Sequence, residues 1–320
     1  MTSRRAALLL AVLAQGMTGC SHLPSWMGGS KAEKPKLAGE RIDVLPVDES
    51  VPVDASVKDV PVVLPPATPN ADWPQHTGVV TAAAGNLAAK GTFDNSSSAS
   101  AGDGESFDHT LIPRPVVAGG TVFAMDADGN ISAHDAADIG TVRWQSKGVS
   151  EKHEPEVMGG GMAYDGGRLY ATSGRGIVVA LDAATGKELW RKSLQVAFPS
   201  APRVADGKLF AITIDNQIFA LDAASGDVLW SQRGIDETAR LMNAVSPTVA
   251  GDTLVVPYSS GEVYAMSIAD GKELWSDSLL ADKRTQAGSV GAGIGGDPVV
   301  DTDVAFTASS GGLLSALYLP

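Results

Sequence analysis

A short pattern recurs four times at nearly even spacing, and it constrains the fold more than any other feature of this sequence. The clearest copies read ALDAATGKELW at 180–190 and ALDAASGDVLW at 220–230, and each copy ends at a tryptophan. The four tryptophans are spaced 46, 40 and 45 residues apart: Trp144, Trp190, Trp230 and Trp275. A fixed period of this length indicates one supersecondary unit that is stacked several times.

Within one unit, the pattern is typical of strands. Residues 206–230 contain short apolar and β-branched runs separated by turn residues, as in an antiparallel meander. Asp222 can accept hydrogen bonds from its own downstream backbone, and Gly226 can take the positive φ that closes the turn. Asp182 and Gly186 hold the same positions in the preceding copy. This recurrence favours a structural role for the aspartates over a catalytic one.

Four strands in a unit of about 40 residues match the blade of a β-propeller. We therefore predict an all-β fold, a β-propeller of four-stranded antiparallel blades, with about five blades in residues 71–320. A fifth unit begins at Pro298, but its tryptophan would fall at about position 326, so the last blade is predicted to be incomplete. Two explanations stay open: a C-terminally truncated chain, or a small ring in which a strand around Trp73 completes the last blade.

The N-terminus has the features of a secretory signal. Arg4 and Arg5 precede an apolar run at 6–14 that is too short to span a bilayer. Cys20, the only cysteine of the chain, follows a Thr-Gly pair at the end of this segment, which resembles the bacterial lipobox. The resemblance implies that residues 1–19 are a signal peptide, that cleavage precedes Cys20 and that the Cys20 sulfur is lipidated.

A tether is predicted to follow the lipid anchor. Residues 20–70 mix charged residues, valines and prolines without helical spacing, which is typical of a flexible segment. Ser21 rather than Asp follows the cysteine, and by the sorting rule of enteric bacteria this favours the outer membrane.

The charge of the chain limits its partners. The formal net charge is -13 and the sequence pI is about 4.7, which argues against nucleic acid and against an anionic membrane surface as partners. Membrane contact is therefore expected through the lipid anchor alone. The 36 glycines and 18 prolines agree with a turn-rich β protein.

The residues suggest no reactive site. The five histidines lack metal-ligand spacing, and no Ser-His-Asp constellation can be singled out. The glycine-rich stretches at 159–161 and 174–176 are not followed by a helix, so they do not resemble phosphate loops. We predict no enzymatic activity, no bound cofactor and no metal.

The repeat at 180–190 resembles the PQQ-like repeat of tryptophan-docking propellers, in which the tryptophan of each outer strand docks into the neighbouring blade. Such proteins usually have eight blades. Together with the lipobox, the tether and the Trp-Pro-Gln segment at 73–75, the repeat makes the chain similar to the BamB family of outer-membrane lipoproteins.

The family resemblance implies a function and partners. It implies a non-catalytic scaffold subunit of the outer-membrane β-barrel assembly machinery, anchored in the outer membrane and facing the periplasm. A BamA-like barrel-forming subunit and other subunits of the assembly complex would be its partners. Unfolded outer-membrane proteins, which could add as strands to an exposed edge, are a second class of partner.

The same resemblance places partner binding on the loop between Trp230 and Pro247. Arg240, Leu241 and Met242 are the candidate residues, although Met242 stands where the family has Arg. An alternative is that Leu241 and Met242 cover the core between blades. The equivalent loop of the next blade, 291–296, lacks the acidic residues of the family.

Two other functions stay open at this point. One is a periplasmic PQQ-dependent quinoprotein dehydrogenase, a class that uses the quinone, Ca²⁺ and often vicinal cysteines, whereas this chain has one cysteine. The other is a generic surface-binding lipoprotein.

Overall fold

The computed structural model describes residues 55–89, 96–104, 113–150, 159–235, 245–279 and 293–319. The chain divides into two units, Met1–Val62 and Val63–Pro320, and the fold described below is that of the second. Cys20 and residues 1–54, which include most of the predicted tether, lie outside the described residues. The lipid anchor and the predicted domain boundaries therefore stay predictions.

The strands form five antiparallel sheets, and each sheet is made of strands that follow one another in the sequence. The first sheet contains β1 (Val116–Ala118), β2 (Thr121–Met125), β3 (Ile131–Asp135) and β4 (Val142–Ser146). The second contains β5 (Gly160–Asp165), β6 (Arg168–Ser173), β7 (Ile177–Asp182) and β8 (Glu188–Ser193). The third contains β9 (Arg203–Ala205), β10 (Lys208–Ile212), β11 (Gln217–Asp222) and β12 (Val228–Arg233). The fourth contains β13 (Thr248–Ala250), β14 (Thr253–Pro257), β15 (Glu262–Ser267) and β16 (Glu273–Ser278), and the fifth contains β17 (Val299–Asp301), β18 (Val304–Ala308) and β19 (Leu314–Tyr318).

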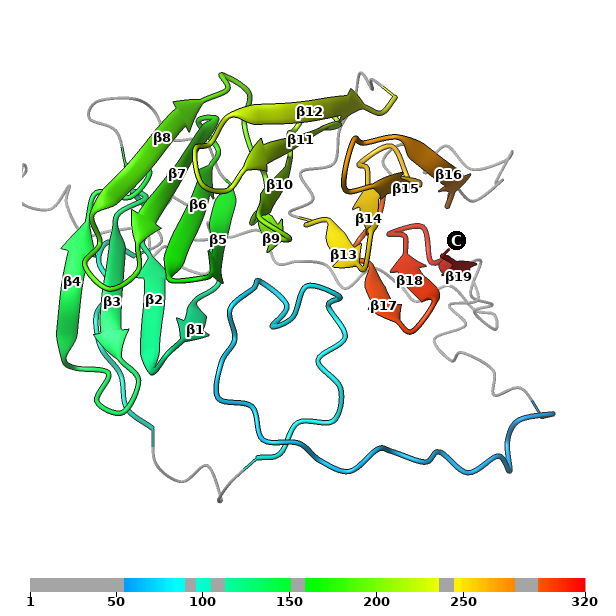
Figure 1. Cartoon of the computed structure of the whole chain (residues 1–320). Coiled ribbons are helices and arrows are strands. Elements are labelled where there is room, and N and C mark those ends of the chain that lie inside the picture. Colours follow the sequence, from blue (N-terminus) through cyan, green and yellow to red (C-terminus); the bar gives the residue numbers. More distant parts are fainter. Residues whose placement is uncertain are drawn as a thin grey trace, which may run out of the picture. The chain divides into compact units, whose positions relative to one another are not determined.

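The five sheets are the blades of a propeller. The first strands of successive sheets, β1, β5, β9, β13 and β17, lie beside one another, and the later strands of each sheet extend outward (Figure 1). The blades form an arc that runs from the β1–β4 sheet to the β17–β19 sheet (Figure 1). The prediction of an all-β propeller with four-stranded antiparallel blades is confirmed. In the described residues the fifth blade has three strands.

The hydrophobic core lies between neighbouring blades. Each of four buried clusters draws side chains from two successive sheets: one of them contains Phe123 of the first blade together with Leu169 and Val179 of the second. The third strands, such as β7, are buried on both faces, whereas the fourth strands are mostly exposed. Each blade therefore depends on its neighbours for burial, as expected of a stacked repeat.

Each fourth strand of the four-stranded blades contains one extra residue where it pairs with the third strand. In the second blade Ala180 faces Trp190 and Leu181 faces Glu188, which leaves Leu189 as the bulged residue, 45% exposed. A bulge bends a strand and redirects the neighbouring side chains. The recurring exposed leucine before the tryptophan is thus a consequence of the bulge.

The tryptophan beside each bulge contacts the next blade. Trp190 Nε1 donates to the carbonyl oxygen of Ala223 at 3.1 Å, and its ring lies against Gly226. Equivalent contacts join Trp144 to Ala183 and Gly186, and Trp230 to Ile268 and Gly271. The indole nitrogen of Trp275 is buried and has no hydrogen-bond partner among the described residues. Adjacent blades are therefore linked at their outer strands as well as through the core.

The turns that receive these tryptophans are held by their aspartates. Asp182 accepts hydrogen bonds from the Thr185 hydroxyl at 2.7 Å and from the Thr185 backbone at 2.9 Å, which lower the pKa of Asp182. Asp222 accepts two backbone hydrogen bonds at 2.8 Å. Gly186 and Gly226 close the turns at φ values of 71° and 74°, a region that favours glycine.

Residues 72–81, called the axial strap below, run along the first strands of the blades. Trp73 pairs with Val117 of β1 through two backbone hydrogen bonds. The alternative in which a strand around Trp73 completes the last blade is therefore wrong: the backbone groups of Trp73 are taken by the inner edge of the first blade, and no pairing with β19 is found among the described residues.

Candidate functional site

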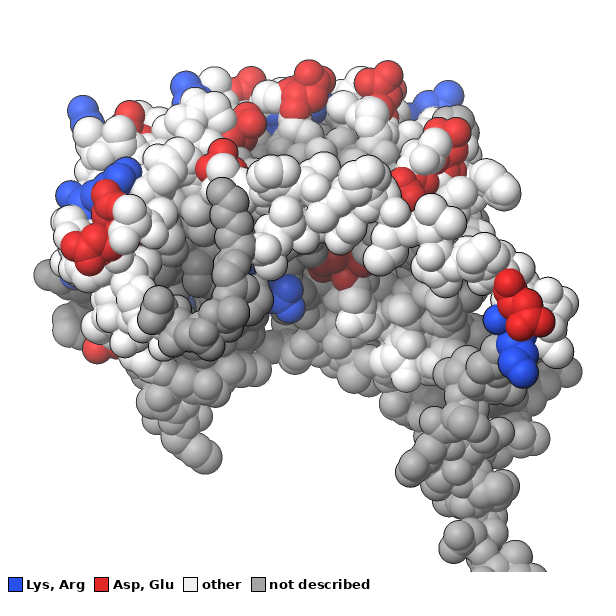
Figure 2. Space-filling model, turned by 90° about the horizontal axis from the view of Figure 1, so that it is seen from below, with Lys and Arg blue, Asp and Glu red and all other residues white. Residues whose placement is uncertain are grey.

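Each blade has two ends with different connections. Because the strands are antiparallel, the turns after the first and third strands share one end, and the turn after the second strand and the link to the next blade share the other. We call the second the loop end. Charged side chains gather along one edge of the body (Figure 2). Exposed acidic residues occupy the turns of the first end: Asp206, Asp227, Asp252 and Asp270.

The turn after the second strand follows one pattern in most blades. It begins with a short polar residue whose side chain accepts backbone hydrogen bonds of the same turn: Asp126, Ser173, Thr213 and Ser309. Three residues later the chain takes a positive φ, and glycine provides it in four blades: Gly129, Gly176, Gly261 and Gly312. The pattern identifies the positions at which one blade departs from the others.

The third blade departs from this pattern at Asn216, which takes a φ of 56° where the other blades have glycine. The buried Asn216 side chain accepts hydrogen bonds from the Ser259 backbone at 3.1 Å and from the Ser259 hydroxyl at 2.9 Å, and it donates to the carbonyl of Ile235 at 3.0 Å. Asn216 thus ties the third blade to the fourth and also holds the start of the connection between them.

The fourth blade departs from the turn pattern at Tyr258, which replaces the short polar residue that begins this turn in the other blades. The Tyr258 ring packs against Tyr264 with centroids 5.3 Å apart, and Gly234 leaves room for it, since a Cβ there would lie 2.6 Å from the ring. The side chain is 1% exposed, and burial raises the pKa of its hydroxyl. That hydroxyl has no hydrogen-bond partner among the described residues.

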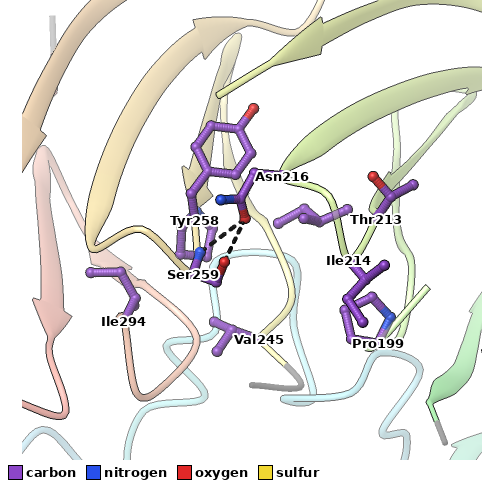
Figure 3. Close-up of a pocket in the computed structure, with 10 residues that line it drawn as sticks. Pro199, Thr213, Ile214, Asn216, Val245, Tyr258, Ser259 and Ile294 are labelled. Atoms are coloured by element: carbon purple, nitrogen blue, oxygen red, sulfur yellow. Dashed lines mark hydrogen bonds between the residues drawn. The ribbon is translucent and has the colours of Figure 1, made fainter. Parts of the chain in front are cut away.

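These two residues line a small pocket at the loop end (Figure 3). Pro199, Val245 and Ile294 come from three successive connections between blades and complete its wall. Figure 3 shows the amide oxygen of Asn216 directed at Ser259, across from these apolar side chains. The pocket has room for little more than one water molecule, so it suits the tip of a side chain better than an organic cofactor.

The predicted partner-binding residues belong to the connections that meet at this pocket. Arg240, Leu241, Met242 and Gly291 lie outside the described residues, so their contacts stay predictions. The described residues on either side are placed: Asn216 binds Ile235, which is 57% exposed, and Val245 lines the pocket. Ile294, on the next connection, lines it as well.

A buried arginine joins the axial strap to the blades. Arg203 of β9 is 0% exposed, and its Nε donates to the carbonyl of Pro247 at 2.7 Å. Its Nη1 donates to the Thr77 hydroxyl and the Val79 carbonyl, both at 3.1 Å, and its Nη2 lies 3.6 Å from Asp297 Oδ2. Burial lowers the pKa of Arg203 to about 10 against the opposing effect of Asp297, so the side chain is charged at neutral pH.

Asp297 completes this cluster. Its Oδ1 accepts a hydrogen bond from the Ser246 backbone at 2.7 Å, and its Oδ2 lies 3.8 Å from Nε2 of His76 in the axial strap. Burial lowers the pKa of His76, although the charge of Asp297 acts in the opposite direction. The cluster therefore connects the third, fourth and fifth blades with the strap.

Sequence reasoning missed Asn216, Tyr258 and Arg203. An alignment of the repeats against one another would have revealed all three, because each replaces the residue type that the other blades share. The equivalent of Arg203 in the other Pro-x-Val segments is Val116, Thr248 or Val299.

A comparison with protein families decides the relationship. The family model described as outer membrane protein assembly factor BamB matches residues 127–317, more than half of the chain. The chain belongs to this family. BamB of Yersinia pestis is 33% identical over 118 residues, which cover 35% of this chain and 29% of that protein. The matches to curated relatives span only 20–29% of their length.

Solved structures of two protein classes share the fold. BamB from Moraxella catarrhalis matches with a TM-score of 0.57 at 20% identity, over 64% of this chain and 60% of that one. The quinohemoprotein alcohol dehydrogenase of Comamonas testosteroni also matches with a TM-score of 0.57, at 17% identity, over 79% of this chain and 48% of the enzyme. These matches agree with the PQQ-like propeller fold of the BamB family and do not separate the two functions.

Two further properties concern the described residues alone. They contain no group of three His, Cys, Asp or Glu side chains that could hold a metal ion. They also contain no helix with the length and hydropathy needed to cross a membrane.

Proposed function

We propose that this chain is a non-catalytic scaffold subunit of the outer-membrane β-barrel assembly machinery and that it binds a BamA-like barrel-forming subunit through its loop end. In this proposal lipidated Cys20 anchors it in the outer membrane, facing the periplasm, and other subunits of the complex are further partners. Membership in the BamB family supports the assignment. The departure from the blade pattern at Asn216 and Tyr258 is the observation that supports a binding site at the loop end.

The geometry suits partner binding in two ways. Asn216 binds Ile235 at the start of the connection, and Val245 lies in the wall of the pocket near its end, so the described residues on either side of 236–244 have defined contacts. Anchored loops lose less conformational entropy on binding. Leu241 and Met242 would supply apolar contacts and Arg240 a charged one, and both Met and Arg are enriched at protein interfaces.

Co-purification in mild detergent tests the proposal. The wild-type lipoprotein is expected to capture the barrel-forming subunit, and replacing both Arg240 and Leu241 with Glu is expected to reduce capture at least about tenfold, as loss of a central contact would. A matched control replaces Lys187 and Leu189 with Glu at the other end of a blade, where both side chains are exposed. The control is expected to capture normally.

Two outcomes would contradict this. Equal capture by the loop variant and the wild type would contradict the proposed interface but not the proposed scaffold role. Absence of the barrel-forming subunit from the wild-type complex would remove the scaffold role itself.

A quinoprotein dehydrogenase is the alternative that the fold allows. The described residues offer no group of three acidic, His or Cys side chains that would bind Ca²⁺, and the pocket at the loop end is too small for a quinone. We therefore derive no catalytic step. A quinone-dependent, Ca²⁺-dependent dehydrogenase activity of the purified chain would favour this alternative. Cleavage by external protease on whole cells would instead favour a surface-binding lipoprotein.

A further inference from the structure

The axial strap contacts the first strand of every blade in turn. In four blades one residue donates its backbone N–H to a carbonyl of the strap. In chain order these hydrogen bonds run from Val117 to Trp73 (2.9 Å), from Tyr164 to Pro74 (2.7 Å), from Val249 to Val80 (3.0 Å) and from Val300 to Thr81 (2.8 Å). The side chain of Gln75 contacts the third blade. Ten residues of strap therefore span all five inner edges.

Gln75 bridges the second and third blades with its amide. Its Nε2 donates to the Val204 carbonyl at 3.2 Å and lies 3.4 Å from that of Tyr164, and its Oε1 accepts from the Val204 backbone at 3.4 Å. A primary amide carries the same donor and acceptor as a peptide group, so Gln75 continues the backbone pairing where the strap turns. The side chain is 3% exposed.

The donors on the blades occupy equivalent positions. Val117, Val204, Val249 and Val300 are each the valine of a Pro-x-Val segment, and Tyr164 takes the corresponding place in the second blade. Each inner strand thus presents to the strap a backbone N–H that its own sheet does not use, and these strands are only three residues long in four of the five blades. Backbone groups that a sheet leaves free at its edge can pair with another segment of chain.

Side chains set the position of the strap along this row. Arg203 binds Thr77 and Val79 from the third blade. Gly78 takes a φ of 92° and lies against the Trp73 ring, since a Cβ there would be 2.8 Å from the ring. Backbone pairing contacts four of the blades and the Gln75 amide contacts the third, and the side chains of Arg203 and Trp73 fix the position of the strap along them.

We propose that the inner edge of the blades is a peptide-binding groove and that residues 72–81 are its ligand, an intramolecular strap that docks as a separable element and holds successive blades together. The proposal concerns the axis of the propeller and is independent of partner binding at the loop end. The peptide that fits this groove turns between Gln75 and Gly78, has a buried Gln amide and places the ring of Trp73 against Gly78.

A cut in the chain tests whether the strap is separable. A site for a specific protease is inserted within residues 90–95 of the full chain, between the strap and the first blade, and the cut protein is passed through a sizing column. We expect the N-terminal fragment to elute with the blades. Gln75→Glu, which places a carboxylate against two carbonyls, is expected to reduce the retained fragment about tenfold. Gln232→Glu, on an exposed position of β12, is the matched control.

The outcomes separate clearly. Complete loss of the wild-type fragment from blades that keep their β circular dichroism would overturn the proposal, as would equal retention of the Gln75→Glu fragment. Hydrogen exchange provides a second measurement if that variant does not fold. In the cut wild-type protein, removal of the fragment is expected to accelerate exchange at Val117, Val249 and Val300, and unchanged exchange there would also overturn the proposal.

Discussion

The ring of Trp190 lies directly against Gly226 of the next blade, so closely that a Cβ atom on Gly226 would come within 2.6 Å of it. Two features therefore require glycine at position 226: its φ of 74° and the indole ring that covers it. Changing Gly226 to Ala is expected to destabilise the fold by about 2–5 kcal/mol, the sum of the cost of a positive φ and of overpacking.

Urea unfolding measures this effect. Gly207→Ala is the matched control because Gly207 has a φ of 69° and open space around the position of a Cβ. It is expected to cost about 1–2 kcal/mol, from the backbone alone. Equal costs for the two variants would show that the contact with Trp190 contributes nothing.

The hydrogen bond of the docking tryptophan can be isolated by comparing two blades. Trp190→Phe removes the donor to Ala223, whereas Trp275→Phe removes an indole N–H that has no partner among the described residues. We expect Trp190→Phe to be the more destabilising by about 1 kcal/mol, the net value of one hydrogen bond. The midpoints of urea unfolding of the two variants check this, and a larger loss for Trp275→Phe would contradict it.

Asn216→Gly is expected to loosen the connection that follows the third blade. Glycine adopts the backbone conformation at this position readily, so the variant loses the side-chain bonds to Ser259 and Ile235 without backbone strain. Limited proteolysis within residues 236–244 should become several-fold faster, while overall stability should fall by about 1–2 kcal/mol. An unchanged cleavage rate would mean that Asn216 does not hold this connection.

Removing the hydroxyl of Tyr258 is expected to stabilise the fold slightly. The hydroxyl is buried and has no hydrogen-bond partner among the described residues, so Tyr258→Phe should raise the free energy of unfolding by up to about 1 kcal/mol. Tyr264→Phe, at a partly exposed ring, is the control and should change it little. A marked destabilisation by Tyr258→Phe would reveal a partner of the hydroxyl.

His76 should make stability depend on pH. Burial lowers its pKa in the folded state below 6.5, so the unfolded chain binds a proton at a higher pH than the folded chain does. The stability linked to His76 is present above pH 6.5 and is lost as the pH falls from 6.5 toward the folded pKa. Unfolding free energies between pH 5 and 7 should therefore fall less steeply for His76→Gln than for the wild type. Identical slopes would show that His76 titrates normally.

The repeats contained most of the information about the blades and little about the axis. Strand order, turn chemistry and the even spacing of the tryptophans all follow from local sequence, and the same sequence pattern recurs in each blade. The axial strap has no period, and its contacts join residues far apart in the chain, such as Gln75 and Val204. Pairing of Trp73 with the outer edge of the last blade was one of two alternatives open from the sequence, whereas in the structure Trp73 pairs with the inner edge of the first blade.

Blades built from similar repeats can be mistaken for one another during folding, and Arg203 distinguishes the third blade from the others. Repeats that resemble one another can pair out of order during folding or exchange between chains, because a wrong neighbour satisfies the same contacts. Arg203 is a charge with no access to solvent. It donates hydrogen bonds to Thr77, Val79 and Pro247, and its Nη2 lies 3.6 Å from the Asp297 carboxylate. A misordered assembly would leave that charge buried without partners, a penalty of several kcal/mol. The buried charge of Arg203 thus favours the native order of the blades over other orders.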